Sequence, residues 1–203
     1  MNYTKAKKSN IKALKKLMKQ QAEVDMMMGG ADNIQSDRYN RDYLVGVGLL
    51  GVTYMNPGLH GWDGLFENGT PFENKNVKAD CRSNASFALK FQDTSVEKLS
   101  ELSTGVITST TFWKNRQPGF LLLGNTRDVG ELLVESYNPE SRRSSTVSMS
   151  RCLDHGFVLV AVNYTRQQVL DTVTSKFPRL AKKLTVKDIY KESDLKNLVA
   201  EMM

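Results

Sequence analysis

Three residues of this chain, Asp63, Glu73 and Lys75, have types and a spacing that could carry out chemistry. Glu73 and Lys75 lie two positions apart in "PFENKNVK" (71–78), so on a strand they would share one face. Two carboxylates that converge on one point repel unless a cation lies between them, and oxygen ligands with open water positions suit Mg²⁺. Such a cation assists phosphodiester hydrolysis, in which Lys75 would hold the attacking water or neutralise the phosphate.

A hairpin would bring these residues together. The segment "WDGLFENGTPFENKNV" contains two short apolar runs around the turn signal Asn68-Gly69, a pattern that predicts two paired strands. Asp63 would then lie on the strand next to Glu73, while the side chain of Asn74 would point to the other face of the sheet.

Composition limits the other possibilities. With 203 residues, of which 40% are hydrophobic and 25% charged, the chain can bury one core, so a single domain over 1–203 is expected. No apolar run approaches the roughly 18 to 20 residues that span a bilayer, and the N-terminus lacks the apolar region of a secretory signal. We therefore expect a cytoplasmic protein without a membrane partner.

The cysteines and histidines exclude several kinds of site. Cys81 and Cys152 are isolated, which argues against a zinc knuckle or a disulfide framework. His60 and His155 are the only histidines, so histidine-rich metal chemistry is excluded as well. Any metal should be a hard cation bound by oxygen.

The net charge of +6 comes from one segment. The rest of the chain holds 21 basic and 22 acidic residues. Seven lysines lie in the first nineteen residues: Lys5, Lys7, Lys8, Lys12, Lys15, Lys16 and Lys19. Apolar residues at spacings of three and four predict an amphipathic helix from Ser9 to Met28. Three interpretations of its lysines are open. They form a solvated face above an apolar docking stripe, they contact phosphates, or, as the third alternative, they lie on a membrane surface.

The remaining patterns predict an α/β (α+β) fold with a central mixed sheet flanked by helices. Strands are expected at 52–55, 87–91, 119–125, 131–138 and 156–164. Helices are expected at 36–50, 95–102, 165–177 and 193–203, with a capped turn from Thr185 to Asp188. The "GVGLLG" within 36–50 matches a dinucleotide-binding pattern, but it does not follow a strand, so its glycines are expected to permit close packing.

The spacing D-x9-E-x-K of Asp63, Glu73 and Lys75 resembles the PD-(D/E)xK restriction-endonuclease-like superfamily. The flanking segment "VGLLGVTYMNPGLHGWDGLFENGTPFENKNV" is similar in order to the helix, strand, turn, Gly-x-Asp and hairpin of its PvuII-type members. Downstream, "GFLLLGNTRDVGELLVESYNPE" resembles their next hairpin. The resemblance covers about residues 40–140 and leaves 140–203 as a C-terminal extension.

The resemblance implies a role for each matching residue. Asp63 and Glu73 would be ligands of Mg²⁺, together with the backbone carbonyl of Asn74, and Lys75 would orient the attacking water. Trp62 departs from the proline of many members. His60 falls about where PvuII-type enzymes have a further acidic residue, so the resemblance leaves open whether one or two metals bind. His60 itself is expected to be a turn or outer-sphere residue rather than a general base.

The resemblance also implies double-stranded DNA as the substrate and 5′-phosphate ends as products. The strand and loop after Glu-x-Lys would approach the major groove, and a second basic cluster would contact the backbone. The candidate DNA-binding residues are Asn76, Lys78, Arg82, Ser83, Asn84, Arg142 and Arg143. Cutting both strands of a palindrome requires a homodimer, and the basic helical region within 1–35 would mediate dimerisation or DNA contact.

The sequence alone leaves alternatives open. A catalytically inactive DNA-binding protein would keep the fold without the chemistry, and a repair or homing nuclease would differ only in its substrate. A third alternative is an interaction protein whose lysine-rich helix docks on an acidic partner. In the DNA-binding and interaction proteins Glu73 and Lys75 would be ordinary residues of a charged strand. In a repair or homing nuclease they would be the centre of the active site.

Overall fold

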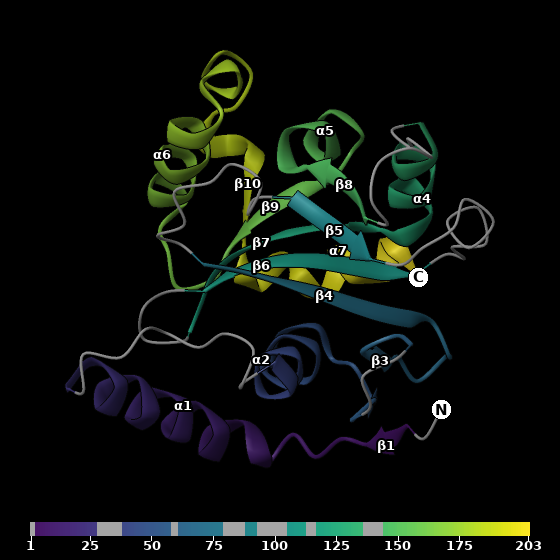
Figure 1. The fold of residues 1–203 in the computed structure, drawn as a ribbon, viewed down its shortest axis with the longest axis vertical. Coiled ribbons are helices and arrows are strands. Elements are labelled where there is room, and N and C mark those ends of the chain that lie inside the picture. Colours follow the sequence, from purple (N-terminus) through teal and green to yellow (C-terminus); the bar gives the residue numbers. More distant parts are fainter. Residues whose placement is uncertain are drawn as a thin grey trace.

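A computed structural model describes residues 3–27, 38–57, 61–78, 88–92, 105–112, 117–135 and 144–203. Within these ranges a mixed eight-stranded sheet forms the centre of the fold (Figure 1). Its order is β1 (Thr4–Lys5), β2 (Tyr54–Met55), β3 (Gly64–Leu65), β4 (Pro71–Lys78), β6 (Val106–Phe112), β7 (Pro118–Asn125), β9 (Val158–Ala161) and β10 (Ile189–Lys191). The β4–β6 and β9–β10 pairs are parallel, and the other neighbours are antiparallel.

Helices cover both faces of this sheet. On one face lie α4 (Thr126–Glu135), α5 (Met149–Asp154) and α6 (Arg166–Lys176), and a small antiparallel sheet of β5 (Ala88–Gln92) and β8 (Ser144–Ser148) lies on the same side (Figure 1). The other face carries α1 (Asn10–Met27), α2 (Arg38–Val45), the π-helical turn η2 (Gly46–Leu50) and α7 (Leu195–Met202). Short turns η4 (Pro178–Lys182), η5 (Val186–Asp188) and η6 (Glu192–Asp194) connect the C-terminal elements.

Each face has its own hydrophobic core, because alternate residues of the central strands point to opposite sides. Phe120 and Leu122 of β7 pack with α4, α5 and α6, whereas Leu121 and Leu123 pack with η2 and α7. All of β7 except Asn125 is buried, as expected for a strand covered on both faces. The predicted mixed sheet flanked by helices is therefore confirmed.

Several predicted elements are confirmed in detail. The amphipathic helix is α1, whose Met18 is buried, and the hairpin is β3–β4. A capping box at Thr165 starts α6, and a second one joins Thr185 to Asp188. The helix predicted for Ser95–Leu102 lies outside the described residues.

The strand predicted for 131–138 is wrong, because α4 follows β7 directly. Val129, Leu132 and Leu133 are buried at helical spacing, and the Asn125 side chain accepts a hydrogen bond from the Arg127 backbone N–H at 2.8 Å. The antiparallel partners of β7 are instead β6, which the sequence patterns did not reveal, and β9. Thus the expected second hairpin is a strand followed by a helix.

Gly46 allows η2 to pack closely on the strand that carries Glu73. A Cβ atom at this position would lie 2.8 Å from Cε1 of the buried Phe72 ring. This confirms that the glycines of "GVGLLG" include one required for close approach, and the segment does not link a strand to a helix in the dinucleotide-binding manner.

Gly46→Ala should lower the free energy of unfolding by about 1–3 kcal/mol, because the buried ring has to move to make room for the methyl group. Urea unfolding monitored by circular dichroism measures this change. Gly48→Ala is the matched control: the closest atom to its new methyl would be the flexible Cδ1 end of Ile11, at 3.3 Å, and the next, Cδ1 of Leu44 at 3.5 Å, is an ordinary contact, so a change of less than about 1 kcal/mol is expected. Equal effects of the two substitutions would contradict the packing argument.

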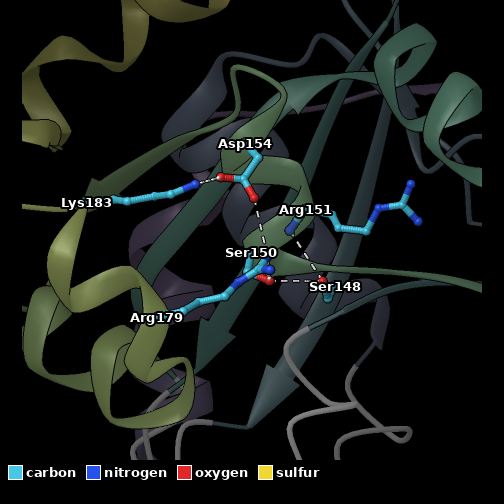
Figure 2. A network of polar contacts seen from close by, with 6 residues as sticks. All are labelled: Ser148, Ser150, Arg151, Asp154, Arg179 and Lys183. Atoms are coloured by element: carbon cyan, nitrogen blue, oxygen red, sulfur yellow. Dashed lines mark hydrogen bonds and ion pairs between the residues drawn. The ribbon is translucent and has the colours of Figure 1, made fainter.

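A polar network ties α5 to the segment after α6 (Figure 2). Asp154 accepts hydrogen bonds from Lys183 at 2.8 Å and from Arg179 at 3.3 Å. Arg179 also donates to the hydroxyl of the buried Ser150 at 2.7 Å, and Ser150 lies 3.2 Å from the hydroxyl of Ser148, which caps α5. The hydrogen bond from Lys183, with the charges of Lys183 and Arg179, lowers the pKa of Asp154 against the opposing effect of burial.

Asp154→Asn should reduce stability at pH 7, and the difference from the wild type should shrink as the pH falls below about 4. A carboxyl group whose pKa is lower in the folded state contributes stability above its unfolded pKa, near 3.9, and loses that contribution as the pH falls through the folded pKa. Urea midpoints measured between pH 7 and pH 3 report the difference. Asp171→Asn on α6 serves as the control, and a pH-independent gap for Asp154→Asn would contradict this assignment.

Candidate active site

The candidate site lies at the N-terminal end of β3, where the longer strand β4 continues without β3 as its partner. Only two residue pairs join these strands, Gly64 to Phe72 and Leu65 to Pro71, so among the described residues β4 is paired beyond Phe72 with β6 alone. Asp63 immediately precedes β3, and Glu73 immediately follows the last β3–β4 pair. The hairpin therefore brings the two predicted carboxylates to one open edge of the sheet.

Hydrogen bonds hold Asp63 at this edge. Its Oδ2 atom accepts a hydrogen bond from the backbone N–H of Asn74 at 2.8 Å, and its backbone carbonyl accepts one from the Asn56 N–H at 2.9 Å. The Asn56 side chain also donates to the Trp62 carbonyl at 3.0 Å. Asp63 and Glu73 are 8% and 7% exposed, so both carboxylates are largely removed from water.

Glu73 and Lys75 share one face of β4, as the strand pattern predicts, and they form an ion pair there. The Lys75 ammonium contacts the Oε1 atom of Glu73, and the Lys75 side chain is more exposed than that of Glu73. Both side chains leave β4 on the face opposite to Asn74, because successive residues of a strand alternate. The ammonium therefore lies beside a buried carboxylate while remaining partly accessible from solvent.

Asn74 occupies the centre of a buried hydrogen-bond network on the other face. Its side-chain N–H donates to Oδ1 of Asp42 on α2 at 2.7 Å. Its side-chain oxygen accepts hydrogen bonds from Thr108 at 2.8 Å and from Thr110 at 2.6 Å, both on β6. All four residues are buried, so this network fixes the rotation of β4 and hence the direction of Glu73 and Lys75.

The backbone of Asn74 points toward Asp63. In a strand the N–H and C=O of one residue leave on the same side, and the Asn74 N–H binds the Asp63 carboxylate. The Asn74 carbonyl is therefore directed to the edge that carries Asp63. The Asn74 carbonyl and the Asp63 and Glu73 carboxylates therefore lie in the same part of the fold, and their role as metal ligands stays a prediction.

Tyr3 is a neighbour of the site that the sequence patterns did not indicate. Burial raises the pKa of its phenol, and the negative charges of Glu73 and then Asp63 raise it further, while a hydrogen bond from the Trp62 backbone lowers it. Its side chain is partly buried. An aromatic hydroxyl from the N-terminus therefore accompanies the carboxylates of the hairpin.

The other predicted site residues lie beyond the part of the chain described in atomic detail. Asn76 and Lys78 belong to β4, but their side chains are not described, and the remaining DNA-binding candidates and His60 fall outside the described residues: Arg82, Ser83, Asn84, Arg142 and Arg143. Asp42, Thr108 and Thr110 were missed by sequence reasoning. An acidic residue directly before the apolar run "YLVGVGLL" was a signal for Asp42, since an acidic residue next to a buried segment is rarely buried without a polar partner.

Three further observations concern the described residues outside this site. Across the described ranges, no three side chains of the His, Cys, Asp and Glu types gather as a metal-binding group. A hollow of about 780 Å³ lies among the start of α1, η2 and α7, and none of the predicted site residues lines it. In the part of the chain described, no helix is both long and apolar enough to cross a membrane.

No protein-family model matches this chain, and no curated protein sequence matches it. The function is therefore inferred from the residues of the site and from their geometry.

Thr108→Val should lower the free energy of unfolding by about 1–2 kcal/mol, because it removes one donor to the buried Asn74 amide without changing the side-chain shape. Chemical unfolding in urea provides the measurement. Thr146→Val on the exposed side of β8 should stay within about 0.5 kcal/mol of the wild type. A Thr108→Val variant as stable as the Thr146→Val control would show that the network does not stabilise β4.

Proposed function

We propose that this protein is a Mg²⁺-dependent, sequence-specific DNA endonuclease with a restriction-endonuclease-like fold. The observation that carries the proposal is the meeting of Asp63, Glu73 and Lys75 at one open sheet edge. The order of α2, β2, Asp63, the β3–β4 hairpin and the Glu-x-Lys strand also agrees with the resemblance that the sequence suggested.

The donor groups at this edge fit a hard cation. Asp63 and Glu73 supply carboxylate oxygens, and the Asn74 carbonyl is directed to the same edge, so the set consists of oxygen atoms alone. Mg²⁺ commonly retains several waters, which accords with one or two protein carboxylates rather than a closed cage. When bound, Mg²⁺ would lower the pKa of water and stabilise negative charge on a phosphoryl oxygen.

The protein side chains have distinct roles in the proposed reaction. Lys75 orients the attacking water and offsets the negative charge that accumulates on the phosphate. The water oxygen forms a bond to phosphorus as the bond to the 3′ oxygen breaks, which leaves a 5′-phosphate and a 3′-hydroxyl. Glu73 keeps the Lys75 ammonium at the reaction centre through their ion pair. Asn74 prevents β4 from rotating, so these groups stay in position.

The proposed substrate is double-stranded DNA, contacted by the strand and loop that follow Lys75 and by the lysines of α1. The α1 lysines at 12, 15, 16 and 19 are exposed, which suits contacts that release counterions from phosphates. A homodimer would place one such site on each strand of a palindrome. The same helix has an exposed Leu17, whose apolar surface suits a contact between two copies.

The test is incubation of supercoiled plasmids and unmodified phage DNA with the protein in Mg²⁺ or in EDTA. The wild type should give discrete fragments only with Mg²⁺. Glu73→Gln and Lys75→Ala should each reduce the cleavage rate by about two orders of magnitude or more, because each removes a charge that acts at the phosphate. Glu201→Gln and Lys196→Ala on α7 remove the same charges on exposed surface of the opposite face and should cleave normally.

Failure of the wild type to cleave any of these DNAs in Mg²⁺ would overturn the proposal. If all variants then retained DNA equally well with and without metal, the protein would be a binding protein on the same fold. If the wild type retained no DNA either, the lysine-rich α1 would be left as a surface for an acidic partner.

A further inference from the structure

The N-terminal strand is attached to the hairpin of the candidate site. Strand β1 pairs with β2 in antiparallel register, with Thr4 opposite Met55, and the Ala6 N–H donates to the Thr53 carbonyl at 2.9 Å. Farther along, the Lys7 N–H donates to the Tyr43 hydroxyl at 2.7 Å. Residues 4–7 are thus fixed to both β2 and α2.

This register places Tyr3 in one cross-strand row with Asn56 and Asp63, with Asn56 between the other two. The residue before Thr4 faces Asn56, the residue after Met55, and the Asn56 N–H is the group that binds the Asp63 carbonyl. The Trp62 backbone makes a hydrogen bond with the Tyr3 phenol, and the charges of Glu73 and Asp63 both act on that phenol. Strand pairing thus places Tyr3 in the row that contains Asp63, and the hydrogen bond with the Trp62 backbone places its hydroxyl next to the residue that precedes Asp63.

A phosphodiester at this edge needs hydrogen-bond donors. The substrate is an anion, and two buried carboxylates repel it, while the Lys75 ammonium already contacts Glu73. A phenol is uncharged at neutral pH and has one O–H that can donate. Because its oxygen accepts the Trp62 hydrogen bond, the ring is oriented before any substrate arrives.

We infer that Tyr3 is a catalytic residue of this site, whose phenolic O–H donates a hydrogen bond to a non-bridging oxygen of the scissile phosphate. The inference rests on the proposed nuclease function. It makes the N-terminal strand part of the active site, in addition to its place before the lysine-rich α1.

The test compares Tyr3→Phe with the wild type on a DNA that the wild type cuts. Single-turnover cleavage in Mg²⁺ should be slowed about 10- to 100-fold, as expected for loss of one donor to a transition-state oxygen. Retention of the same DNA in EDTA should change by less than about twofold, because the charged groups remain. Tyr190→Phe on β10 removes an exposed phenol elsewhere and should cleave at the wild-type rate.

Each result separates the possible explanations. Wild-type cleavage by Tyr3→Phe would overturn this inference and leave the proposed nuclease function standing. No cleavage by the wild type would overturn both. A slower Tyr3→Phe enzyme whose melting temperature also fell well below that of Tyr190→Phe would assign Tyr3 a structural role and overturn the inference. Slow cleavage with an unchanged melting temperature and unchanged DNA retention would support it.

Discussion

The hydrogen bonds of Asn74 are the constraint on which the candidate site depends. One side chain joins β4 to α2 through Asp42 and to β6 through Thr108, while its backbone N–H joins β4 to Asp63. A slip of one residue in β4 would move Glu73 and Lys75 to the α2 face and would leave the buried amide without these partners. The register of the strand and the direction of the charged side chains are therefore set together.

The position of the site follows from the unequal lengths of two strands. Strand β3 has two residues and β4 has eight, so the hairpin ends at the point where the charged residues of β4 begin. The buried side of β4 is secured by the parallel β6 and by the Phe72 ring against η2. Among the described residues this edge is therefore held by β6 on one side, while β4 has no strand partner beyond Phe72 on the other.

The sequence predicted the parts of the fold in which local pattern and tertiary packing agree. Alternation and an Asn-Gly turn were sufficient for the β3–β4 hairpin, and capping residues were sufficient for the start of α6 at Thr165. Strand β6 was not predicted because "VITSTTF" places threonines where a buried strand usually has apolar residues. Those threonines make sense only with Asn74, which is 34 residues away from Thr108 in the chain.

The candidate site shows the same division between local and distant information. The spacing of Glu73 and Lys75 identified their shared face, because that relation is a property of one strand. Tyr3 could not be identified, since its position depends on pairing between β1 and β2, whose residues are about fifty positions apart in the chain. The error over 131–138 has a similar origin: "ELLVE" suits a strand or a helix, and burial of Leu132 and Leu133 on one side decides for α4.

The long separations within the Asn74 network also have a kinetic consequence. Asp42, Thr108 and Thr110 lie 32, 34 and 36 residues from Asn74, and the parallel β4–β6 pair closes over a comparable length of chain. Closing such loops costs conformational entropy before any contact rewards it, so these contacts form late relative to helices and hairpins. The β3–β4 hairpin can form early, but Glu73 and Lys75 acquire a fixed direction only when the rest of the sheet has assembled.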